Sequence, residues 1–159
     1  WGNQRFQVPF FNDKNEIERI LQNGKYAIIA LAAENEPYIV TLSYGYDKES
    51  KSLYFHCALK GHKINVLNIN NKACATIIVD HGYNAKKCEH SYESLIIRGE
   101  LIIVDDLAEK KHGLSILLNH LEDDPDPIIK RNIINENSYN KVVILRLKMN
   151  NIIGKENIK

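Results

Sequence analysis

The sequence predicts a mainly β protein with helices, an α+β fold built on six antiparallel strands in a small closed or half-closed barrel. Two observations lead to this fold class. Six apolar, β-rich segments follow one another along the chain, and short polar turns join the first three. The helical segments interrupt or cap these strands and do not form the regular strand–helix–strand crossovers of a parallel sheet.

The composition predicts a single globular domain spanning residues 1–159. Hydrophobic residues make up 44% of the chain, and its 21 basic and 20 acidic residues are well mixed. The sequence shows no basic stripe and no apolar run of membrane-spanning length. We therefore expect neither nucleic acid nor a membrane as a partner.

The chain begins with an expected N-terminal arm at residues 1–12, which have no clear period but carry four aromatic side chains. Asp13 is a typical N-cap residue, and Glu16 completes the pattern of a capping box. Asn23-Gly24 then ends a short helix with isoleucine and leucine at helical spacing.

Three strands follow, at residues 26–32, 38–46 and 52–57. Residues 34–36 read as a turn and residues 47–51 as the loop of a hairpin. Consecutive strands with such short connections predict an antiparallel meander.

The middle of the chain predicts a helix at residues 62–70 and a fourth strand at 73–79. Residues 80–91 are polar and predict a loop. A long fifth strand covers 92–104, and Gly99 in its middle indicates a bulge or a bend.

The last third predicts a helix capped by Asp105-Asp106, a break at 122–127, a short helix at 128–134 and a sixth strand at 141–149. A tail follows the sixth strand. The leucines of the first of these helices share one face: Leu107, Leu114, Leu117, Leu118 and Leu121.

The junction between the third strand and the next helix is a candidate anion site. Gly61, His62 and Lys63 stand at the helix start, where free backbone N–H groups and the helix dipole favour a phosphate. In the alternative interpretation, Gly61 only ends a turn and both cations are solvated. His56 lies on the opposite strand face from Phe55 and Cys57, and is either a polar strand-end residue or a ligand contact.

Other familiar motifs are absent. The patterns GxGxxG, GxxxxGK[ST] and GxSxG do not occur. His81, Cys88 and His90 match no common zinc spacing, so we expect no metal. The three cysteines Cys57, Cys74 and Cys88 form no CxxC pair, which favours a reducing cytoplasm.

Two segments together resemble the FMN-binding split-barrel superfamily: YIVTLSYGY at residues 38–46 and LYFHCALKGHKIN at residues 53–65. Within it the similarity is closest to the pyridoxamine 5′-phosphate oxidase-like branch that includes the Nim 5-nitroimidazole-resistance proteins. The order of elements agrees from Asp13 onward. One departure is Thr41, which stands where relatives commonly have proline and which restores a backbone N–H beside the expected flavin.

The resemblance implies a homodimer with FMN at the subunit interface. It also implies that the strand around residues 40–43 would line the isoalloxazine ring, that residues 56–58 would follow the ribityl chain, and that His62 and Lys63 would bind the phosphate. The second subunit would contribute residues near Tyr92 and Ser94. The implied cofactor-binding residues are Val40, Thr41, Leu42, Ser43, Phe55, His56, Cys57, Ala58, His62, Lys63, Tyr92 and Ser94.

For function, the resemblance implies an FMN-dependent oxidoreductase of the Nim type, which reduces a small electron acceptor such as a nitroimidazole or nitroaromatic compound. His56 is the candidate catalytic residue, with His56 or His62 as a proton donor. The alternatives are a flavin-binding protein without a dedicated substrate, a pyridoxamine 5′-phosphate oxidase, and a haem-handling relative with His81 or His90 as an axial ligand. The oxidase needs a second phosphate site, and the arginines of this chain are few and scattered.

Overall fold

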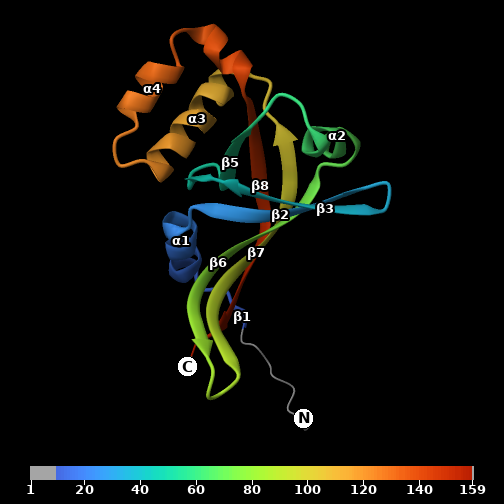
Figure 1. Ribbon diagram of the computed structural model, residues 1–159, viewed down its shortest axis with the longest axis vertical. Coiled ribbons are helices and arrows are strands. Elements are labelled where there is room, and N and C mark those ends of the chain that lie inside the picture. The colour runs from blue at the N-terminus through green and yellow to red at the C-terminus, as the bar shows by residue number, and fades with distance from the viewer. Residues whose placement is uncertain (1–9, 159) are drawn as a thin grey trace.

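The computed structural model describes residues 10–158 and consists of one long antiparallel sheet with helices packed around it (Figure 1). Residues 1–9 of the expected arm lie outside the described part of the chain. The elements in chain order are β1 (Phe10–Phe11), α1 (Lys14–Asn23), β2 (Tyr26–Ala33), β3 (Glu36–Ser43), β4 (Gly45–Asp47), β5 (Ser52–Cys57), α2 (His62–Ile69), β6 (Lys72–Asn84), β7 (Glu89–Ile103), α3 (Leu107–Leu121), α4 (Asp126–Asn132), the 3₁₀ helix η1 (Glu136–Lys141) and β8 (Val143–Asn157). The strand order is β3-β2-β6-β7-β8-β5-β4, and β1 pairs with β8.

The predicted antiparallel α+β class is confirmed, but the predicted number of strands is wrong, because the described residues form eight strands and not six. One addition is β1. The other arises because the predicted strand 38–46 breaks at Tyr44 into β3 and β4. The Tyr44 side chain is fully buried, its Oη donates to the Leu21 carbonyl at 2.8 Å, and its backbone N–H donates to the Lys25 carbonyl. These tertiary contacts take Tyr44 out of the strand ladder.

The break at Tyr44 carries the chain from one edge of the sheet to the other. β3 pairs with β2 at one edge, β4 pairs with β5 at the opposite edge, and one residue separates them. The expected meander is therefore interrupted, and the sheet curls until its two edges meet at Tyr44 while its hydrogen-bond ladder stays open. The interior of this open barrel is filled by apolar side chains that include Ile29, Leu53, Phe55, Ile77, Leu95, Ile97, Leu101, Leu145 and Leu147.

The predicted polar loop at residues 80–91 is wrong. β6 continues to Asn84 and β7 begins at Glu89, so most of this segment is a hairpin that projects from the body of the protein (Figure 1). Side chains 80–88 are all exposed, so the sequence shows no alternation there, although the backbone still pairs, for example Tyr83 with His90. The residues after 149, predicted as a tail, also belong to a strand, because β8 continues to Asn157 and pairs with β7.

Gly99 marks a β-bulge, as its place in a strand predicted. Arg98 pairs with Asn151 and Gly99 with Met149, so Asn150 is the extra residue on β8.

The predicted helices are confirmed, with small changes at their ends. Asp13 caps α1, since its Oδ1 accepts from the N–H groups of Asn15 at 2.9 Å and Glu16 at 3.0 Å. The Glu16 carboxylate accepts from Arg19 Nε at 2.9 Å and does not close the predicted capping box. No helix within residues 10–158 is long and apolar enough to cross a membrane.

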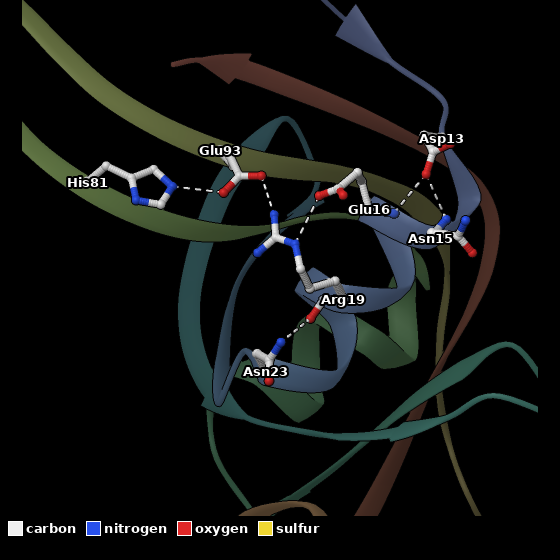
Figure 2. Close-up of polar contacts among 7 residues, drawn as sticks. All are labelled: Asp13, Asn15, Glu16, Arg19, Asn23, His81 and Glu93. Atoms are coloured by element: carbon white, nitrogen blue, oxygen red, sulfur yellow. Dashed lines mark hydrogen bonds and ion pairs between the residues drawn. The ribbon is translucent and has the colours of Figure 1, made fainter. Parts of the chain in front are cut away.

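A buried carboxylate ties α1 to the base of the β6–β7 hairpin (Figure 2). Glu93 on β7 is 4% exposed, and its two oxygens accept from Arg19 on α1 and, at 2.8 Å, from His81 Nε2 on β6. Burial makes a carboxylate costly unless such partners are present. The three residues thus fix the position of the helix on the sheet.

We expect Arg19→Ala to lower the free energy of unfolding by about 1–2 kcal/mol, because Glu93 loses one of its two side-chain partners while His81 remains. Denaturant unfolding measures this change. Lys14→Ala is the matched control, because Lys14 is an exposed residue of the same helix with no side-chain partner within the described residues. Equal stability of the two variants would show that Arg19 does not stabilise buried Glu93.

We expect His120 to make the stability depend on pH. Its Nε2 donates to the Gly24 carbonyl at 2.6 Å, and burial lowers the pKa of its imidazole below the ordinary 6.5, although the hydrogen bond opposes this. The unfolded chain then binds this proton more readily than the folded chain. Stability from this group is complete above pH 6.5 and is lost as the pH falls through the folded pKa.

We therefore expect wild type to lose more free energy of unfolding than His120→Gln between pH 7.5 and pH 5, measured by urea unfolding at each pH as a difference between the two proteins. Other histidines contribute equally to both proteins and cancel. Parallel pH profiles would contradict the assignment.

Candidate functional site

The start of α2 is an open, cationic helix N-terminus. Gly61 is the N-cap, no side chain caps the helix, and the N–H groups of His62 and Lys63 belong to the first turn. Gly61 has a φ of 147°, which side-chain-bearing residues rarely adopt, and a Cβ added there would meet nothing within 4 Å. The helix dipole and the charge of Lys63 thus stand at a helix start that is open to an anion.

β3 reaches this helix start through an aromatic contact. The rings of Tyr38 and His62 meet edge to face, with centroids 4.9 Å apart. This contact orients the His62 imidazole beside the strand predicted to line the flavin ring. The sequence analysis did not select Tyr38, because it is 24 residues from His62 and no local pattern signals the contact.

The end of β5 lies against the same helix start. Burial raises the pKa of the Cys57 thiol, and the nearby Lys63 ammonium group opposes that rise. Lys63 is half-buried, whereas His62 and Ala58 are exposed. Cys57 and Lys63, which the sequence selected separately, are therefore neighbours.

Residues 40–43 alternate between the two faces of β3. Val40 and Leu42 point inward and pack against the core that contains buried Phe55, whereas Thr41 and Ser43 lie on the exposed outer face. The strand predicted to line the ring thus offers polar side chains on its outer face. The structure brings together the three segments that the sequence selected: β3, the end of β5 and the start of α2.

His56 is the exception within this group. Its side chain lies on the face of β5 opposite Phe55 and Cys57, and it lines a cavity that α3, α4 and η1 border. The predicted roles of His56 on the ribityl chain and in proton transfer stay predictions.

Tyr92 and Ser94 lie elsewhere on the sheet. With Thr76, Ile78 and His90, they line a shallow hollow of about 310 Å³ on the outer face of β6 and β7, near the base of the projecting hairpin. α2 lies toward the other end of the sheet (Figure 1). Within one chain, the two predicted residues are thus not grouped with the helix start.

The other histidines that the sequence singled out are engaged with carboxylates. His81 donates to Glu93, and His90 Nε2 donates to Asp80 Oδ1 at 2.8 Å. No group of three or more potential metal ligands occurs within residues 10–158.

The chain is similar to one protein family and to several proteins of known structure. The family described as pyridoxamine 5′-phosphate oxidase matches residues 13–156. A solved structure of a candidate 5-nitroimidazole antibiotic resistance protein from Bacteroides thetaiotaomicron is 26% identical, with a TM-score of 0.78 over 93% of this chain and 86% of the other. No curated protein matches the chain.

Two further solved structures share the fold at lower identity. A FAD-binding protein from Mesorhizobium loti is 18% identical, with a TM-score of 0.69 over 96% of this chain and 99% of the other. The flavocytochrome Anf3 from Azotobacter vinelandii is 15% identical, with a TM-score of 0.81 over 98% of this chain and 72% of the other.

Proposed function

The chain belongs to the pyridoxamine 5′-phosphate oxidase family, and from this premise we propose that it binds FMN and acts as an oxidoreductase that reduces a small electron acceptor, such as a nitroimidazole or another nitroaromatic compound. One observation carries the proposal: the open N-terminus of α2, with Lys63 against the end of β5 and His62 against β3. The similarity to a 5-nitroimidazole resistance protein supports the substrate class.

The residues at the helix start would hold the phosphate. Lys63 supplies a full charge, His62 a ring N–H, and the first-turn amides further donors. Acidic side chains are absent from residues 58–69, so nothing in this segment repels a dianion. Cys57 and Ala58 would contact the ribityl chain. The backbone of β3 at residues 40–43 would contact the isoalloxazine ring.

A bound flavin supplies a ring that accepts and returns electrons. The protein would orient that ring with the backbone of β3 and limit water around it. The His62 imidazole would remain a donor to the flavin phosphate, as described above. Edge contact with Tyr38 keeps that imidazole in place.

A homodimer would complete the site. The outer face of β3, β2 and β6 leaves three large apolar side chains uncovered: Tyr26 is 54% exposed, Ile39 66% and Ile78 47%. Such a patch is typical of an interaction surface. Tyr92 and Ser94 lie in the hollow on the same face, so they are placed to serve the flavin of a second copy.

The free cysteines are the basis on which we propose a cytoplasmic location. Cys57, Cys74 and Cys88 are all free, which suits a reducing cytoplasm.

The test is a visible absorption spectrum of the purified protein supplied with FMN, followed by anaerobic reduction and titration with a 5-nitroimidazole. We expect flavin bands near one equivalent per chain, bleached by the reductant and restored by the nitro compound. If the bound, reduced flavin is not reoxidised by the nitro compound, the protein binds flavin but lacks the proposed activity. A colourless protein that does not bind added FMN would overturn the proposal. Sedimentation equilibrium tests the proposed dimer separately.

A further inference from the structure

The helical layer at the end of β5 borders a cavity of about 340 Å³ that is partly open to solvent. Its volume is at the small end of the roughly 300–1,000 Å³ typical of small-molecule sites. β5 separates it from the proposed flavin site, because His56 faces the cavity while Cys57 on the opposite face contacts Lys63. The cavity is lined by His56, Leu114, Leu117, Leu118, Leu121, Glu122, Ile128, Asn132, Ile133, Ser138, Tyr139 and Val142.

The cavity exists because α3 carries more apolar surface than its neighbours cover. Leu117 is buried against the sheet, but Leu114, Leu118 and Leu121 are only half-buried. α4 lies over this face, yet none of its residues is fully buried (Figure 1). The two helices therefore leave an apolar space between them where tightly packed helices would leave none.

Three polar side chains at the edge of this space have no partner. These residues, His56, Glu122 and Asn132, are exposed to solvent, and none makes a side-chain hydrogen bond or ion pair to another described residue. Glu122 can only accept a hydrogen bond, and the imidazole of His56 offers an acceptor nitrogen when it is neutral. An apolar space edged by acceptors that no other side chain occupies is complementary to an apolar ligand that carries a hydrogen-bond donor, which would replace water at the acceptor.

We propose that this cavity binds a small aromatic heterocycle with an N–H donor, whose ring lies among the leucines of α3 and the side chains of Ile128 and Ile133 and whose N–H donates to His56. A rigid ring loses little conformational freedom on binding, which suits so small a site. The inference does not rest on the flavin proposal.

Indole and benzofuran are matched probes, because they have nearly the same shape and only indole has the N–H. Isothermal titration calorimetry of the full chain should give saturable binding of indole and about 3- to 10-fold weaker binding of benzofuran. Amide shifts in NMR spectra should concentrate in α3, α4 and η1. His56→Ala should reduce the preference for indole, and an unchanged preference would overturn the role of His56.

Leu118→Trp and Leu121→Phe fill the cavity and should abolish saturable binding of both probes. Ile134→Trp is the control, since Ile134 is 79% exposed and does not line the cavity. Thermal unfolding establishes that each variant folds, and FMN titration of Leu118→Trp separates this site from the flavin site. Wild type that binds neither probe, or filled variants that bind as wild type does, would overturn the proposal.

Discussion

Lys63→Ala is expected to weaken FMN binding by about 10- to 150-fold, because a charge-assisted hydrogen bond to a phosphate contributes about 1.5–3 kcal/mol. Lys63 is half-buried beside Cys57, so it is less exposed than a free surface lysine. Quenching of flavin fluorescence on titration with protein measures the dissociation constant. Lys63→Arg should retain part of the affinity, because it keeps the charge but not the compact shape.

Lys130→Ala is the control for Lys63, since Lys130 is exposed on α4, which takes no part in the proposed flavin site. It should bind FMN as wild type does. If Lys63→Ala also bound FMN with unchanged affinity, the assignment of the phosphate to the start of α2 would be lost.

Gly99→Ala is expected to cost about 3 kcal/mol or more of unfolding free energy, at or above the upper end of what overpacking usually costs. A Cβ at this position would lie 1.8 Å from the carbonyl oxygen of Lys148 on the paired strand. Because that atom is backbone within the β7–β8 ladder, it cannot move aside as a flexible side chain would. Denaturant unfolding with circular dichroism detection measures the loss.

Glu100→Ala is the neighbouring control, because Glu100 is exposed on the same strand. Its truncation should change the free energy of unfolding by no more than about 0.5 kcal/mol. A stable Gly99→Ala protein would mean that β8 can shift its register at the bulge and that the close approach is dispensable.

The sequence predicted most of the elements that have a strong local signal. The Asp13 cap and the Asn23-Gly24 end of α1 follow from hydrogen bonding within one turn. The leucine spacing of α3 and the strand-interrupting Gly99 are equally local. The family could also be identified from the sequence, because the residues that carry the resemblance lie in one short segment, LYFHCALKGHKIN.

Two wrong predictions have different physical causes. The strand 38–46 is uniform in composition, and it breaks only because Tyr44 buries its ring and bonds to Leu21 and Lys25. The hairpin at residues 80–91 looked like a loop, because strand pairing needs only backbone groups and its exposed side chains carry no pattern.

For the candidate site, the sequence by itself determined the chemistry at the start of α2: a glycine, a histidine and a lysine at a helix N-terminus, whose attraction for a phosphate is local. Only the tertiary structure decided what these residues face. It placed Tyr38 against His62, directed His56 away from Cys57 into a separate cavity, and set Tyr92 and Ser94 in a hollow of their own. The physical reason is that strand alternation gives the two faces of a strand, whereas the curl of the sheet and the packing of α3 and α4 decide what covers each face.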